Sequence, residues 1–201
     1  SLSVRQEQPV EKHFLGNPYH FRAQRSTARE SQKLTANHMH NYIQLWYVLR
    51  GGFRHIWNGV EYFQKEGDFL IIPPRFSHQL DTRGTVDMEF IFCELTDGFL
   101  SIFPDSKEKS TLFNLAYLQP LLCSAEQMKP YLTFHGPAKE RLEALLLQIV
   151  AEYNAMNNLS STVLRSLILR LLTVVAQEYE GMALLETDLV FSKYRAAIQD
   201  A

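Results

Sequence analysis

Two histidines stand one residue apart at the head of an apolar stretch, NHMHNYIQLWYVLRGG, at residues 37–52. A third histidine, His78, ends the stretch GDFLIIPPRFSH at residues 67–78. Neutral imidazole is a good ligand for zinc, nickel and copper, and three histidines with water or a fourth ligand form a known type of site. His38, His40 and His78 are therefore candidate ligands for zinc, nickel or another divalent metal. The alternative is that these imidazoles line a pocket that holds no metal.

The strand that we expect after the histidine pair has one mixed face and one apolar face. Side chains alternate along a strand, so the even-numbered residues from His38 to Arg50 share a face, and the odd-numbered ones are mostly apolar. Such a strand fits the wall of a β-barrel whose mixed face lines a cavity. We expect these residues to bind a small-molecule ligand: Tyr42, Gln44, Trp46, Arg50 and Phe90.

Arg50 bears on the kind of ligand, because a guanidinium group makes paired hydrogen bonds with carboxylate or phosphate. An aromatic wall with one guanidinium suits a small polar or anionic effector. The alternatives are that Arg50 is a solvated strand end and that Trp46 belongs to the core.

The chain up to about Leu95 has the pattern of short strands joined by tight turns. We expect strands at 21–25, 41–49, 53–57, 60–63, 69–72 and 86–95, with Asn58 and Gly59 forming a two-residue hairpin turn. Short antiparallel strands of this kind predict a barrel or a sandwich.

The second half changes to a helical period. Apolar residues recur at helical spacing after Pro137 and again after Ser160 or Ser161, up to Gly181. The second helix is apolar on more than one side, so it needs more than one covering surface. These surfaces are either the barrel and a second subunit, or the barrel and the neighbouring helix. For the homodimer we expect an antiparallel helix contact through Leu164, Leu167, Leu171 and Val174.

Composition fits a cytoplasmic protein. The 201 residues carry a formal net charge of −2, which argues against nucleic-acid binding by bulk electrostatics in this segment. The two cysteines, Cys93 and Cys123, stand in apolar surroundings and suggest buried thiols in a reducing compartment. A secretory signal and an uncharged apolar run of about 18 residues are both lacking, so we expect no membrane association.

The spacing of the histidine motifs resembles the cupin superfamily. His38, His40, Gln44 and Gly51 are similar to its first motif, and Gly67, Pro73 and His78 to its second. Two positions depart from the pattern, because Gln44 replaces the usual glutamate and Arg75 the usual glycine. A neutral amide in place of the carboxylate makes oxygenase or isomerase chemistry less favourable.

The order of the parts resembles the N-terminal sensor domain of AraC-type transcription regulators. The resemblance rests on the cupin motifs, the two helices and the closing sequence FSKYRAAIQDA, which looks like the linker to a DNA-binding domain beyond residue 201. It implies a domain that binds a small-molecule effector and dimerises, without being an enzyme, and that contacts DNA only through the domain that follows. The alternative is a stand-alone metal-dependent cupin enzyme, a dioxygenase or sugar isomerase.

Together these patterns predict a mainly β protein with a C-terminal helical pair. We expect an N-terminal arm or tail at 1–13, a cupin-like antiparallel β-barrel at 14–95, and short helices and loops at 96–136. A helical dimerisation hairpin follows at 137–181, and a linker at 182–201.

Overall fold

The computed structural model describes residues 5–6, 20–31, 34–57, 59–96, 99 and 131–183. Strands precede two long helices, as the change in apolar period predicted. Most of the expected arm, most of segment 96–136 and the linker from residue 184 onward lie outside the described residues. The elements are β1 (Arg5–Gln6), β2 (Phe21–Ser31), β3 (His38–Met39), β4 (Ile43–Arg50), β5 (Gly52–Trp57), β6 (Val60–Lys65), β7 (Asp68–Ile72), β8 (His78–Asp81), β9 (Thr85–Leu95), β10 (Leu132–Thr133), α4 (Gly136–Ala155) and α5 (Ser160–Ala183).

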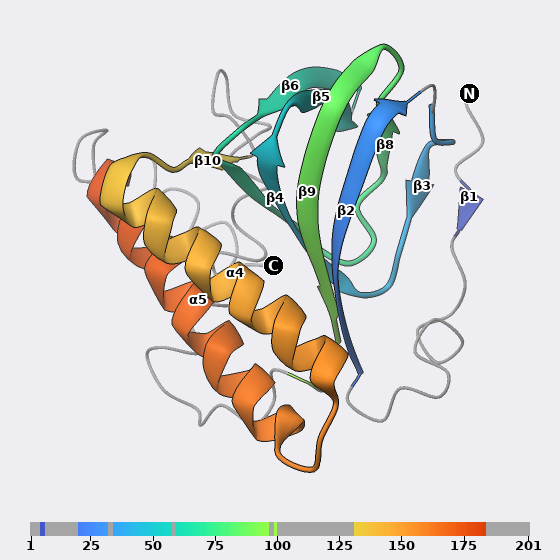
Figure 1. Ribbon diagram of the computed structural model, residues 1–201. Coiled ribbons are helices and arrows are strands. Elements are labelled where there is room, and N and C mark those ends of the chain that lie inside the picture. The colour runs from blue at the N-terminus through green and yellow to red at the C-terminus, as the bar shows by residue number, and fades with distance from the viewer. Residues whose placement is uncertain are drawn as a thin grey trace, which may run out of the picture.

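The strands form two five-stranded sheets. One, here called the helix-side sheet, has the order β10-β7-β4-β9-β2, and the other, here called the histidine sheet, has the order β1-β3-β8-β5-β6. Neighbouring strands are antiparallel except for β1 and β3, which pair in parallel. Figure 1 shows α4 and α5 lying beside each other along the helix-side sheet.

The local sequence signals explain several element boundaries. Trp57 pairs with Val60, so β5 and β6 are joined by the predicted two-residue turn, and Gly59 adopts a positive φ of 76°. Strand β4 begins at Ile43, two residues later than predicted, because residues 41–42 form a bend. Strand β2 continues to Ser31, beyond the predicted end, because it pairs with β9 along most of its length. The short strands β1, β3, β8 and β10 were not predicted.

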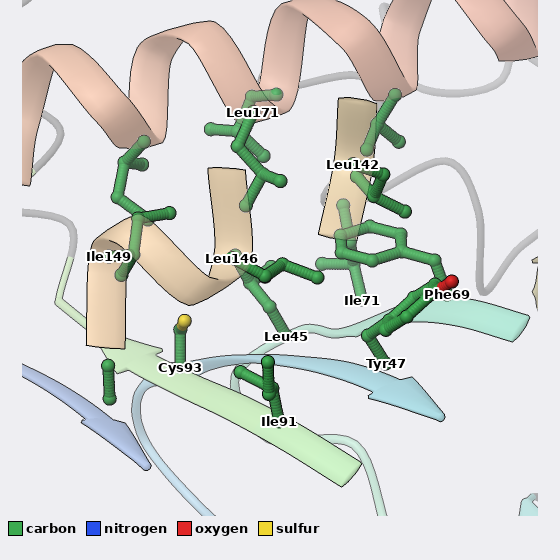
Figure 2. Close-up of a cluster of buried hydrophobic side chains, with 14 of the residues drawn as sticks. Leu45, Tyr47, Phe69, Ile71, Ile91, Cys93, Leu142, Leu146, Ile149 and Leu171 are labelled. Atoms are coloured by element: carbon green, nitrogen blue, oxygen red, sulfur yellow. The ribbon is translucent and has the colours of Figure 1, made fainter. Parts of the chain in front are cut away.

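Packing of the helices against the helix-side sheet forms the larger hydrophobic core. The outward-facing residues of β4, among them Leu45 and Tyr47, lie in one buried cluster with residues of both helices. Figure 2 shows Leu142, Leu146 and Ile149 of α4 between this sheet and α5. Helix α4 is thus buried on two sides, whereas α5 lies farther from the sheet.

The predicted dimer contact on α5 is wrong in its residues. Leu164 and Leu171 are completely buried in the chain's own core, Val174 is 5 % exposed, and Leu167 is partly buried against the same core. The apolar pattern of α5 required more than one covering surface, and α4 and the helix-side sheet provide them. These four residues therefore form no exposed patch, and a homodimer needs another surface. The helix is long and apolar enough to span a bilayer from Ser160 to Glu178, but core helices share this property.

A matched pair of substitutions tests this core. Leu146→Ala, at a side chain that is 1 % exposed, should lower the free energy of unfolding by about 2–5 kcal/mol through lost burial and a cavity. The adjacent change Leu147→Ala, at a residue that is 39 % exposed, should cost less than about 1 kcal/mol. Urea denaturation followed by circular dichroism measures both, and equal losses would contradict the packing described.

Candidate functional site

The inner face of the helix-side sheet meets the histidine sheet in a second buried cluster. Trp46, Val48 and Ile72 of the helix-side sheet lie in it with Phe53 and Trp57 of the histidine sheet. This cluster is therefore the interior of the barrel, and the even-numbered side of β4 faces it as predicted from alternation. The odd-numbered side faces the helices.

Aromatic rings make up much of this interior. The Trp46 ring stacks on Phe90 with centroids 4.6 Å apart and planes inclined by 16°. Phe92 lies 5.7 Å from Trp46, and Phe53 lies at the same centroid distance on the opposite sheet. Trp46 and Phe90, two of the expected ligand-binding residues, are thus brought together inside the barrel.

The three predicted metal-ligand histidines also gather in one place. His38 and His78 are direct partners across β3 and β8, and their ring centroids lie 4.4 Å apart. The centroid of His40 lies 5.3 Å from that of His78 and 6.3 Å from that of His38. Residues 40 positions apart in the chain therefore share one cluster.

A fourth histidine, His55, joins this cluster, although the sequence left open whether it lines the cavity or lies outside. Its Nε2 atom lies 3.0 Å from Nδ1 of His78, within hydrogen-bond distance, and the residue is completely buried. Alternation along β5 places Phe53, His55 and Trp57 on one face, but it does not decide whether that face points into the barrel.

Burial keeps the two innermost imidazoles neutral. Desolvation is the main cause that lowers the pKa of His55 to about 3, and the nearby His38 lowers it further. Desolvation also lowers the pKa of His78 well below its ordinary value, with additional effects of His55, His38 and His40. Neutral imidazole is the form that binds a metal ion.

The histidine donor set suits a metal ion in type. Nδ1 of His38 donates to the Ala36 carbonyl and Nδ1 of His40 to the Tyr42 carbonyl, both at 2.8 Å, which directs metal binding to Nε2. Nδ1 of His78 is engaged by His55, and Nε2 of His78 is buried without a hydrogen bond in the described part of the chain. However, no group of three such side chains among the described residues is arranged to hold an ion. Binding would therefore require the rings to turn toward a common point.

Gln44, which replaces the usual glutamate of the cupin motif, is itself hydrogen-bonded to a carboxylate. Its Nε2 donates to Oε1 of Glu94 at 3.1 Å, and Glu94 also pairs with Arg22 at 3.1 Å. Glu94 is 5 % exposed and was missed from the sequence. Alternation along β9 offered a signal, because Glu94 shares a face with Phe90 and Phe92.

The other two predicted ligand-binding residues have different surroundings. Tyr42 is 2 % exposed and stacks on His40, with ring centroids 4.4 Å apart. Arg50, in contrast, is not in the interior, because the side chain is 60 % exposed and lies 3.8 Å from Glu89. A register shift between Val48 and Arg50 turns Arg50 out of the alternation, so its expected place beside Trp46 was wrong.

The buried histidines predict a pH dependence of stability in metal-free protein kept in EDTA. The unfolded chain gains protons below pH 6.5, whereas folded His55 stays neutral down to a pKa of about 3. Stability is therefore complete above pH 6.5 and should fall by about 1.4 kcal/mol per histidine for each pH unit well below it. Urea titrations between pH 7 and 5 should show a smaller slope for the variant with His55→Gln and His78→Gln. An unchanged slope would contradict the assignment.

Comparison with known proteins supports the barrel. Residues 29–94 match the family described as Cupin domain. No functionally curated protein matches the sequence. Among solved structures, apo ToxT K231A from Vibrio cholerae is 12 % identical, with 80 % of this chain and 57 % of that chain covered and a TM-score of 0.52.

Two other solved structures match a smaller share of the chain. A putative ethanolamine utilization protein from Salmonella typhimurium is 20 % identical, with 38 % of this chain and 58 % of that chain covered and a TM-score of 0.31. The polyketide cyclase RemF from Streptomyces resistomycificus is 21 % identical over 37 % and 53 %, with a TM-score of 0.33. The matches thus span less than two thirds of each of these proteins. Residues 29–94 thus match a cupin domain, and the fold consists of mostly antiparallel sheets followed by two C-terminal helices.

Proposed function

We propose that this chain is the effector-sensing domain of an AraC-type transcription regulator and binds a small molecule inside the barrel. The observation that carries the proposal is a set of buried polar atoms that make no hydrogen bond within the described part of the chain. In the interior these atoms are Gln44 Oε1, Trp46 Nε1, His55 Nδ1, Trp57 Nε1, both amide atoms of Gln64, and His78 Nε2. Buried polar atoms in folded proteins nearly always have a partner, which here would be water or a ligand.

The position of the helices supports a regulatory role. Strand β4 points Trp46 into the barrel and Tyr47 toward α4. The Tyr47 hydroxyl donates to Oε1 of Glu143 on α4 at 2.7 Å, and burial together with this bond raises the pKa of Tyr47. A ligand that shifts β4 would therefore also shift the helical pair. An enzyme that works only inside its barrel has no need of this connection.

The likeness to ToxT adds to this argument. ToxT is a regulator of the AraC family, and the match extends over the barrel and the helices together. At 12 % identity this likeness concerns the fold, so the effector is to be sought from the residues of this chain. Contact with DNA belongs, in this proposal, to a further domain joined after the helices.

The proposal predicts that a small molecule and DNA binding are coupled in the complete protein. Denaturation of the purified protein should release a small molecule that mass spectrometry detects. Adding this molecule back to the folded protein should change the protein's affinity for the promoter DNA of its own gene. Tyr47→Phe should leave ligand affinity nearly unchanged and reduce the change in DNA affinity, because it removes the bond to Glu143. The exposed change Gln148→Leu serves as control. Ligand binding without any effect on DNA affinity would contradict the proposal.

A metal-dependent enzyme is the second candidate, and the histidine cluster is the observation that favours it. His38, His40 and His78 would hold a divalent ion through Nε2, and the ion would supply a Lewis acid for a ligand oxygen. Tyr42 would help to orient the His40 ring by stacking on it. Glu94, bound to Gln44, would provide a negative charge on the neighbouring strand.

Elemental analysis tests the metal. Protein purified without a nickel column should contain close to one zinc, nickel or other divalent ion per chain. His78→Ala should remove it, whereas His135→Ala, at an exposed position before α4, should retain it. Protein that stays metal-free after incubation with each ion would contradict a metal site.

A further inference from the structure

We propose that the effector is a flat, uncharged molecule with a hydrogen-bond donor next to an acceptor, and that Gln64 and Trp57 recognise it. This inference rests on the proposed function, because it assumes that the barrel interior binds a small molecule. It goes beyond that function by assigning the chemical class of the ligand and two residues that recognise it through hydrogen bonds.

Gln64 is placed where a ligand would need to be recognised. It lies on β6 directly across from Phe53, whose side chain belongs to the interior cluster, so Gln64 faces the same interior. The residue is completely buried, yet neither its Nε2 nor its Oε1 makes a hydrogen bond within the described residues. The amide therefore presents one donor group and one acceptor side by side, which matches an amide, a lactam or a similar group.

The two tryptophans add donors and a flat surface. Trp57 is 1 % exposed and Trp46 is 7 % exposed, and the Nε1 atom of each lacks a hydrogen bond in the described structure. An indole N–H can only donate, so each requires an acceptor atom. The parallel rings of Trp46 and Phe90 show that flat groups stack at this place.

The charges around the interior argue against an anionic ligand. Arg50 points outward, and Arg22 is paired with the buried carboxylate of Glu94. A carboxylate or phosphate placed beside Gln64 would thus lose water without gaining the guanidinium of Arg50 or of Arg22 as a partner.

Three probes of similar size separate these properties. Benzamide is flat and uncharged and carries the donor and acceptor, benzoate adds a charge, and cyclohexanecarboxamide keeps the amide but is not flat. The chain has two tryptophans, and both face the interior, so their fluorescence reports binding there. Benzamide should change the emission and raise the melting temperature, with benzoate and cyclohexanecarboxamide binding at least about tenfold more weakly. Equal or tighter binding of either would overturn the proposal.

A matched pair of variants assigns the effect to Gln64. Gln64→Leu should abolish the response to benzamide while keeping or raising the melting temperature of the ligand-free protein, because it removes an unpaired buried amide. Gln148→Leu, the same change at an exposed position of α4, should leave the response intact. Trp57→Phe, which removes the indole donor, should weaken benzamide binding. Unaltered benzamide binding by Gln64→Leu would overturn the role of Gln64.

Mass spectrometry of the molecule released from the purified protein distinguishes the two proposals. A flat, uncharged molecule supports both. A charged or aliphatic effector that still changes DNA affinity would overturn the ligand class and leave the sensing function standing. If no molecule is released and none of the probes binds, both proposals are wrong.

Discussion

The structure depends on a sheet that is buried on both faces. Strand β4 lies in the middle of the helix-side sheet, with β7 on one side and β9 on the other. Its odd-numbered side chains pack on the helix side, and the even-numbered ones up to Val48 face the barrel interior. A sheet covered on both sides has no solvent face, so a movement of its central strand must be accommodated by the helices or by the interior.

The two faces of this sheet are built differently. The outer face is almost entirely apolar, and packing there resembles any protein core. The inner face mixes aromatic rings with amide, indole and imidazole groups, several of which make no hydrogen bond in the described structure. Each such group lowers stability by about 1–3 kcal/mol until a partner reaches it. The outer core therefore stabilises a fold whose interior is adapted to take up a partner.

The histidine cluster illustrates how strand register creates a site. Its members come from β3, from the residue that follows β3, from β5 and from β8. Pairing of β8 with both β3 and β5 brings His38, His55 and His78 to one region of the interior. Because burial keeps His55 and His78 neutral, the cluster can form without repulsion between imidazolium groups.

The sequence by itself determined the order of strands and helices, the hairpin turn at residues 58–59 and the face of β4 that points inward, because each follows from local periodicity or backbone preference. It also indicated the gathering of His38, His40 and His78, through a resemblance in motif spacing. Only the tertiary structure decided that His55 and Glu94 accompany these residues, since cross-strand register depends on all strands at once. A local shift in that register moved Arg50 outward. The structure also decided that α4 and the helix-side sheet cover the broad apolar surface of α5. A periodic pattern indicates how much surface must be buried, but not which element buries it.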